Sequence, residues 1–446
     1  MGFSREKVLL LVLVLHLIYG VYQARSGHYL LRDSQEYLHA AENLLTHQEL
    51  YCGEYPPAAN PNYYSKRPPL YPLLLVPFTA LGWTPGGVIF LQILISLLAC
   101  LLAWKLMEEF LENPAAGKIV FIALLFFLPA PMIYPNLVMT EVWLQLIILG
   151  MVWALWKAHN QKDQQVTWLL GHQLGVIAGF LLKPVMYLYI PVAGIALLIL
   201  GKGIHLWKRI ALLVLPFIVL MVYIGWNEGR TGYAHVSSIQ QINLLNYNLK
   251  YTLIAAVGED QANAIVDSIR HEGDAKPTYA QRQAFIQEAA VAQITSNLGA
   301  YTKMHLKGMI NFFIDPGRFD LYNFWGIEQQ EGKGFLYHYS KEGYKGIFTY
   351  LRTQPIGILC VLLVVFLANL LKTVGFIGFC LDFGLPVLDR LIIAAPVGYL
   401  AVLSGPLGAS RFAMPVNLLM VIATAVFISR RYKRPSAANK PATEKE

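Results

Sequence analysis

Several apolar stretches, each close to the length needed to cross a lipid bilayer, constrain this chain more than any other feature. A membrane helix needs roughly 20 apolar residues. Of the 446 residues, 56% are hydrophobic, and the mean hydropathy is +0.47. The sequence therefore predicts an all-α polytopic integral membrane protein. The expected spans are residues 8–22, 86–107, 118–134, 137–157, 167–183, 184–201, 208–226, 354–371, 391–406 and 411–429.

Basic residues between these stretches indicate how the chain crosses the membrane. Lys and Arg gather in the loops 105–118, 157–165 and 202–209 and again in the tail 430–446, and cytoplasmic loops carry such an excess. The same bias accounts for the net charge of +8, which needs no nucleic-acid partner to explain it. Both termini are therefore expected in the cytoplasm, and the loop 25–85 is expected on the outer face.

The number of crossings depends on two interrupted apolar segments. Termini on the same side require an even number of crossings. Residues 373–389 contain several glycines and a proline and are expected to be re-entrant or interfacial, which gives ten spans. Residues 70–81 are short and hold two prolines, so they are placed at the interface. If both segments crossed, the number would be twelve.

Four regions follow from this pattern. They are an N-terminal transmembrane module with the first outer loop (1–226), a polar and mostly helical outer region (227–352), the C-terminal transmembrane helices (353–429) and a basic cytoplasmic tail (430–446). Apolar residues within 34–46 recur at helical spacing, which is typical of an amphipathic helix on a membrane surface. A chain of this length without large added domains favours a bacterial inner membrane, with the loop 25–85 facing the periplasm.

Ionisable residues gather at the outer ends of the expected spans. Asp33 follows the first span, and a basic, proline-braced stretch follows at 65–72. Ionisable groups near lipid are costly and mark candidate functional sites. The residues concerned are Asp33, Lys66, Arg67, Glu141, Lys183 and Arg411.

Each of these residues also has a simpler interpretation. Asp33 and Glu141 could cap the helices that begin beside them, and the cations could anchor span ends among lipid headgroups. Their convergence argues against that interpretation, because the positive-inside bias would place four cations on the opposite face. The sequence therefore predicts one site at the outer rim of the membrane domain.

These motifs, in this order, resemble the membrane-embedded GT-C glycosyltransferases that depend on a polyprenyl phosphate. The similarity is greatest to the group containing the protein O-mannosyltransferases and the bacterial aminoarabinose transferase of lipid A. It rests on Asp33 in Arg-Asp-Ser-x-x-Tyr, on Lys-Arg-Pro-Pro-Leu-Tyr-Pro at 66–72, on Thr140-Glu141 and on Arg411 in Arg-Phe-x-x-Pro. Members often carry Asp in place of Glu141. The resemblance implies a GT-C-like bundle of about ten transmembrane helices, with outer-face amphipathic helices and a small outer helical region.

The resemblance also implies an activity. A hexosyl or pentosyl group would pass from a polyprenyl-phosphate donor to a lipid, glycan or protein acceptor on the outer face, with inversion. Asp33 would be the general base, and Glu141 a second acid that positions the acceptor or the base. Asp33 is favoured as base because the helix dipole lowers the basicity of Glu141. The remaining roles are binding of the donor phosphate by Lys66, Arg67, Lys183 and Arg411, and positioning of donor or acceptor by Tyr37 and Tyr71.

Two alternatives stay open at this point. Some GT-C enzymes use a divalent metal, and Asp33 with Glu141 could hold one, although no ligand cluster demands it and no other cofactor is indicated. A transporter, flippase or polymerase for lipid-linked sugars would also place cations near a lipid phosphate. A transporter would need a charge-lined route across the membrane, and His172 is the main ionisable residue near the middle of an expected span.

Overall fold

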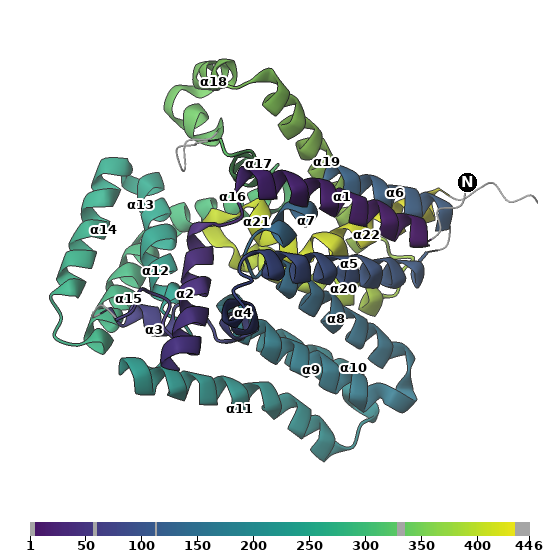
Figure 1. Cartoon of the computed structure of the whole chain (residues 1–446), viewed down its shortest axis with the longest axis horizontal. Helices are drawn as coiled ribbons and strands as arrows, with labels where there is room; N and C mark the ends of the chain where they lie inside the picture. Colours follow the sequence, from purple (N-terminus) through teal and green to yellow (C-terminus); the bar gives the residue numbers. More distant parts are fainter. Residues whose placement is uncertain (1–4, 57–59, 112–113, 328–334, 433–446) are drawn as a thin grey trace, which may run out of the picture.

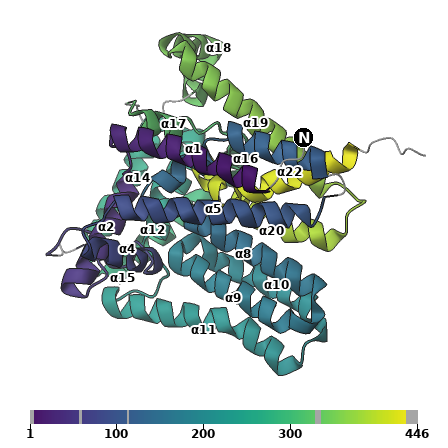
Figure 2. The ribbon, with the colours of Figure 1, turned by 45° about the vertical axis from the view of Figure 1, so that its right-hand side comes forward.

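Helices build this protein, as the apolar pattern predicts. The computed structural model describes residues 5–56, 60–111, 114–327 and 335–432, and within these ranges it contains helices and connecting turns and no strand. The long helices run in roughly one direction as a block, and shorter helices gather at one end of it (Figures 1 and 2).

Eight helices, counted over the described residues, are long and apolar enough to cross a membrane, so the chain is an integral membrane protein. Two segments bent by 66° at their break, α6 (Pro114–Phe127) and α7 (Ala130–Ile133), make a ninth span if taken together. The remaining expected span, 391–406, corresponds to α20 (Val387–Leu403), whose 17 residues lie at the lower limit for crossing. Length and composition alone therefore identify eight or nine of the ten expected spans, and α20 is the one that falls short of the length. The eight are built on α1 (Arg5–Ser26), α5 (Gly86–Glu108), α8 (Glu141–Asn160), α9 (Gln165–Leu182), α10 (Ile190–Leu200), α11 (Leu206–Thr231), α19 (Ile356–Cys380) and α22 (Asn417–Arg431). Short flanking helices lengthen three of these spans, to Lys162–Leu182, Pro184–Gly203 and Ser410–Arg431.

The loop between α1 and α5 forms three helices. The first, α2 (Arg32–His47), contains the amphipathic segment expected at 34–46 and buries Tyr37 and Ala41. A short helix, α3 (Asn62–Ser65), leads into the basic stretch. The apolar helix α4 (Leu70–Ala80) has 11 residues, which is too short to cross a bilayer as a straight helix; its place at the interface stays a prediction.

The polar region after α11 is helical, as expected, and breaks near 276 and 316. Its elements are α12 (Ile239–Asn243), the π-helix η5 (Leu244–Leu249), α13 (Lys250–Val257), α14 (Glu259–Asp274), α15 (Tyr279–Ser296), α16 (Leu298–Ile314), α17 (Arg318–Trp325) and α18 (Phe335–Thr353). A small separate core joins η5, α13, α14 and α15 through residues such as Leu249, Val266 and Ile286. Further short elements are the 3-10 helices η1 (Tyr134–Asn136), η2 (Lys162–Gln164), η3 (Pro184–Tyr189) and η4 (Gly201–Gly203).

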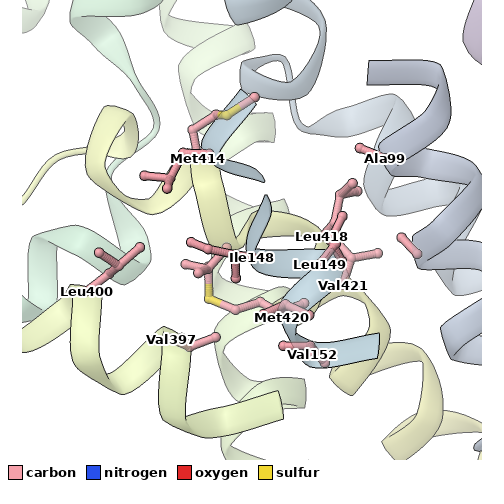
Figure 3. Packing of buried hydrophobic residues seen from close by; sticks show 14 of the residues in the cluster. Ala99, Ile148, Leu149, Val152, Val397, Leu400, Met414, Leu418, Met420 and Val421 are labelled. Atoms are coloured by element: carbon pink, nitrogen blue, oxygen red, sulfur yellow. The ribbon is translucent and has the colours of Figure 1, made fainter. Parts of the chain in front are cut away.

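The last span lies at the centre of the transmembrane block. In its apolar window 83% of the residues are buried, against 22% in α1. The chain reaches α22 from α20 through η6 (Gly405–Leu407), α21 (Ser410–Ala413) and η7 (Met414–Val416). Because its neighbours enclose α22 on all sides, the residues at its start are held firmly. Figure 3 shows this packing for Leu418, Met420 and Val421 of α22, Ile148, Leu149 and Val152 of α8, Val397 and Leu400 of α20, Met414 of η7 and Ala99 of α5.

Residues 373–389 do not form the separate re-entrant or interfacial segment that was predicted from sequence. The helix α19 continues without a break to Cys380, a turn follows, and α20 begins at Val387. A side-chain carbon at Gly375 would overlap the side chain of Thr424 in α22. Glycine is therefore needed at 375 for two spanning helices to approach closely, and it does not end the helix.

A second close approach links α16 to the turn before α21. A side-chain carbon at Gly308 would overlap the carbonyl oxygen of Gly405, and one at Gly408 would overlap that of Gly308. The two backbones therefore touch directly. At the other end of α22, Arg430 donates to Asp382 at 2.9 Å. Residues 433–446 of the expected basic tail lie outside the described residues.

Candidate active site

Arg411 joins the two acids that the sequence places at the ends of separate spans. Its Nη2 donates to Oδ2 of Asp33 at 2.5 Å, and its Nε donates to Oε1 of Glu141 at 2.8 Å. Asp33 lies in the first turn of α2, Glu141 is the first residue of α8, and Arg411 belongs to α21. Three distant segments of the chain thus meet at one guanidinium group.

Each of these carboxylates has a second cationic partner. Arg67 Nη2 donates to Oδ1 of Asp33 at 2.7 Å, and Lys183 Nζ donates to Oε1 of Glu141 at 2.9 Å. The side chain of Glu141 is fully buried, whereas Asp33 and Arg411 expose 25% and 24% of theirs. A substrate can therefore reach Asp33 and Arg411 directly, while Glu141 lies beneath them.

Local sequence explains where Lys183 and Asp33 are presented. Proline disfavours helical backbone in the residue before it, so α9 ends at Leu182 and Lys183 is extended ahead of Pro184. Ser34 accepts from the backbone N–H of Leu31 at 2.9 Å, which closes the start of α2 and fixes Asp33 in its first turn. A carboxylate is favoured there by the helix dipole.

Glu36 is part of this ion-pair network and was not predicted. It binds Lys66 Nζ at 2.6 Å through Oε1 and Arg67 Nε at 2.7 Å through Oε2. Its position three residues after Asp33 puts both acids on one face of α2, and that spacing is the signal in the sequence that could have found it. Lys66 therefore pairs with Glu36, while Arg67 bridges Glu36 and Asp33.

Tyr37 and Tyr71 both have partners within the protein. Their rings meet edge to face with centroids 4.9 Å apart, and the guanidinium of Arg67 lies over the ring of Tyr37 at 4.9 Å. The hydroxyl of Tyr71 donates to Gln92 at 2.7 Å, and Gln92 in turn donates to the carbonyl of Leu137. Both tyrosines are buried. They support Arg67 and the segment before Glu141.

The neighbouring charges determine the protonation of Asp33. Burial alone would raise the pKa of its carboxyl, but Arg67 and Arg411 outweigh burial and hold that pKa well below its usual range. Asp33 is therefore ionised at neutral pH and, in this arrangement, is a weak base. The helix dipole does not distinguish Asp33 from Glu141 as base, because both lie in the first turn of a helix.

The two acids do not fit a divalent metal. Both oxygens of Asp33 and one of Glu141 already accept from Arg67, Arg411 or Lys183. A cation between the acids would meet three positive groups at the same oxygens. Across the described residues, no group of three or more His, Cys, Asp or Glu side chains is arranged to hold a metal ion.

Two further groups of buried polar residues were not predicted from the sequence. Lys372 is buried inside α19 and donates to the side-chain oxygens of Asn369 and Asn417. It was missed because the span was ended at residue 371, so His172 is not the only ionisable residue to consider within the spans. The second group surrounds Asp320, next to a small cavity of about 20 Å³ that Lys372 also lines.

Comparison with known proteins supports the resemblance seen in the sequence. Residues 66–226 match the family described as dolichyl-phosphate-mannose-protein mannosyltransferase, which confirms the resemblance to GT-C glycosyltransferases over that part of the chain. Lys66, Arg67, Glu141 and Lys183 lie inside the matched part. Asp33 and Arg411 lie outside it.

One solved structure is also similar to this chain. The structure is the archaeal oligosaccharyltransferase AglB from Archaeoglobus fulgidus, in complex with an inhibitory peptide and a dolichol-phosphate. It is 14% identical, with a TM-score of 0.42, and the alignment covers 96% of this chain and 50% of that one. This chain thus spans half the length of that structure. No curated protein matches the sequence.

Proposed function

We propose that this protein is a glycosyltransferase that moves a sugar from a polyprenyl-phosphate donor to an acceptor on the outer face of the membrane. The observation that carries the proposal is the position of Arg411, forked between Asp33 and Glu141. A guanidinium group can bind two phosphate oxygens at once, and here it lies beside a carboxylate that can accept a proton. The family match over 66–226 supports the donor class.

The reaction needs one base and a set of cations. The acceptor hydroxyl gives its proton to Asp33 while its oxygen forms a bond to the anomeric carbon. The bond between that carbon and the phosphate oxygen breaks on the opposite side, and its electron pair leaves with the lipid phosphate. The anomeric centre is therefore inverted. Arg411 and Lys183 stabilise the charge that gathers on the phosphate, and Glu141 holds both cations in place.

The balance of charge in the site suits a phosphate. The cations Lys66, Arg67, Lys183 and Arg411 face the acids Asp33, Glu36 and Glu141, so one positive charge is in excess. A phosphate that binds Arg411 competes with Asp33 for the same guanidinium. Once released, Asp33 has lost one of the two cations that lower its pKa, and it becomes a stronger base. Donor binding would thus prepare the base for the acceptor.

Accessibility favours Asp33 over Glu141 as the base. An acceptor hydroxyl must come within hydrogen-bond distance of the group that takes its proton. Asp33 is partly exposed, whereas the side chain of Glu141 is covered completely. Glu141 is better placed to orient Arg411 and Lys183 from below.

The proposed membrane orientation follows from the distribution of charge. Both termini would lie in the cytoplasm, and the ion-pair network would face the periplasm with the outer region 227–352. The acceptor would be a lipid, a glycan or a protein carrying a hydroxyl group. The regions 1–226 and 353–429 would together form one transmembrane unit, since Arg411 of the second contacts Asp33 of the first.

A transfer assay with the purified full-length protein tests this proposal. The protein is placed in sealed vesicles with a polyprenyl-phosphate sugar, and both glycosylated acceptor and free polyprenyl phosphate are measured. We expect the two products in equal amounts. A flippase would instead move the intact donor between leaflets. The proposal would be overturned if intact donor is translocated, no sugar passes to a hydroxyl acceptor or to water, and no lipid phosphate is released.

A further inference from the structure

A second network of buried polar groups lies directly behind Arg411. The carboxylate of Asp320, in α17, accepts from the hydroxyl of Tyr134 at 2.6 Å through Oδ1 and from the hydroxyl of Ser410 at 2.5 Å through Oδ2. Asp315 accepts from the backbone N–H of Ser410 at 2.8 Å. Ser410 is thus held by two carboxylates of the outer region, and the next residue is Arg411.

We infer that Asp315 and Asp320 are positioning residues that hold Ser410 and thereby aim Arg411 at the donor phosphate, and that this hold requires ionised Asp320. The inference rests on the proposed function, because it gives Arg411 a donor to bind. Both acids form hydrogen bonds with Ser410, the residue before Arg411, and they act on the guanidinium through the chain at that residue.

The helix that carries Arg411 has little rigidity of its own. It spans only the four residues Ser410–Ala413, and its N-cap residue Ala409 has no side chain that could accept a hydrogen bond. The first N–H groups of a helix need partners from elsewhere, and Asp315 supplies one for Ser410. The outer region therefore provides the cap that the local sequence lacks.

The hydrogen-bond donors around Asp320 indicate that its carboxyl group must be ionised to hold Ser410. Both oxygens of Asp320 accept from hydroxyl groups. A protonated carboxyl must donate from one oxygen, so Ser410 or Tyr134 would have to turn its hydroxyl hydrogen elsewhere. Protonation therefore weakens the hold on Ser410, and the aim of Arg411 becomes less well defined.

The surroundings of Asp320 raise the pKa of its carboxyl group toward the physiological pH range. Burial raises the pKa of Asp320 to about 6, although the hydrogen bonds from Ser410 and Tyr134 lower it; Asp315 adds to the rise and Arg411 opposes it. Lys372 is a further charged group lining the same cavity. An ordinary Asp has a pKa of about 3.9. The hold on Ser410 is thus expected to weaken as the pH falls through about 6.

The free energy of unfolding should depend on the protonation of Asp320 in the opposite sense to donor binding. A carboxyl whose folded pKa is raised stabilises the folded state below its unfolded pKa, and that contribution is lost as the pH rises through about 6. Acidification therefore strengthens the fold through Asp320 while it weakens donor binding. If Asp320 positions Arg411, donor affinity should fall between pH 7 and pH 5 while the unfolding temperature does not fall. Unfolding of the protein would lower both.

The test compares Asp320→Asn and Ser410→Ala with wild type in steady-state kinetics from pH 5 to pH 8. At pH 7 we expect each variant to raise the donor KM by about tenfold, the scale of losing one hydrogen bond to a charged group. The change in kcat should be smaller. The wild-type donor KM should rise below pH 6, and Asp320→Asn should remove that rise. Asp267→Asn is the matched control, because Asp267 is exposed in the outer region.

A second measurement does not depend on catalysis. Hydrogen exchange of the peptide covering 409–414 should be faster in both variants, without a fall in the unfolding temperature. If Asp320→Asn does not fold, Ser410→Ala decides the question alone, because it keeps both carboxylates and the backbone N–H.

The two proposals can fail separately. If Arg411→Ala leaves the donor KM at its wild-type value, then the phosphate role of Arg411 in the proposed function is wrong. If Arg411→Ala raises the donor KM while Asp320→Asn and Ser410→Ala do not, only the positioning role is wrong. Equal donor KM for wild type at pH 5 and pH 7 would overturn the requirement for ionised Asp320.

Discussion

Arg411 and Asp33 are 378 positions apart in the chain and are joined by an ion pair of 2.5 Å. The pair ties the start of the last span to the segment between α1 and α5. Since Arg411 also binds Glu141, one side chain connects α2, α8 and α21 at the candidate site. Changes at either residue therefore affect the geometry of both ends of the chain.

Replacement of Asp33 by Asn tests the assignment of the base. Asn keeps the size and can still accept hydrogen bonds, but it does not take a proton. We expect a folded protein that binds the donor lipid and transfers sugar at least about a hundredfold more slowly, the usual scale for losing a general base. Turnover and donor binding are measured on the same purified sample. Glu42→Gln, at an exposed position of α2, is the control for charge removal, and near-normal turnover of Asp33→Asn would assign the base elsewhere.

Replacement of Arg411 tests the binding of the phosphate. Arg411→Ala should weaken donor affinity about tenfold to a hundredfold, because it removes hydrogen bonds from a charged group. Arg411→Lys should restore only part of the affinity, since a point charge replaces a planar fork. Donor affinity is read by equilibrium binding, alongside the amount of folded protein. Arg270→Ala removes an exposed arginine of the outer region and should behave as wild type.

The continuity of α19 can be tested through its packing. Gly375→Ala introduces a carbon that overlaps Thr424, and overpacking of this kind costs about 1–3 kcal/mol. The thermal unfolding temperature should fall. Gly357→Ala is the matched control in the same helix, since a side-chain carbon there meets nothing within 4 Å. Equal unfolding temperatures for the two variants would show that α19 and α22 are further apart than described.

The proposed topology makes a separate prediction. A reporter fused after residue 434 should behave as cytoplasmic, because the end of α22 is rich in arginine. A reporter inserted near residue 270, in the polar outer region, should behave as exported. An exported C-terminus would require an odd number of crossings, and α20 would then be the first helix to reconsider.

The residues of the ion-pair network could be predicted where topology alone brings them together. Asp33, Glu141, Lys183 and Arg411 each lie at a span end on one side, so counting crossings places them at the same depth. Glu36 needed only the spacing of one helical turn. These inferences depend on periodicity and charge, which are local properties of the sequence.

The network behind Arg411 could not be predicted in this way. Contacts of Asp320 with Tyr134 and Ser410 depend on how α17 docks against two other segments, and no local pattern encodes that docking. Lys372 was missed for a different reason. Glycine at 375 favours a break when it is read alone, and only the position of Thr424 shows that it serves helix packing.

The backbone contact between Gly308 and Gly408 limits how the outer region can be exchanged. A foreign domain grafted between α11 and α19 would need a glycine at the position of Gly308, whatever its surface or fold, because Gly408 of the membrane domain stays in place. Without that glycine, its first effect would be to displace the turn that leads into Arg411. The interchangeable part of the region 227–352 is therefore its exposed face, and the fixed part includes the place where α16 touches the turn before α21.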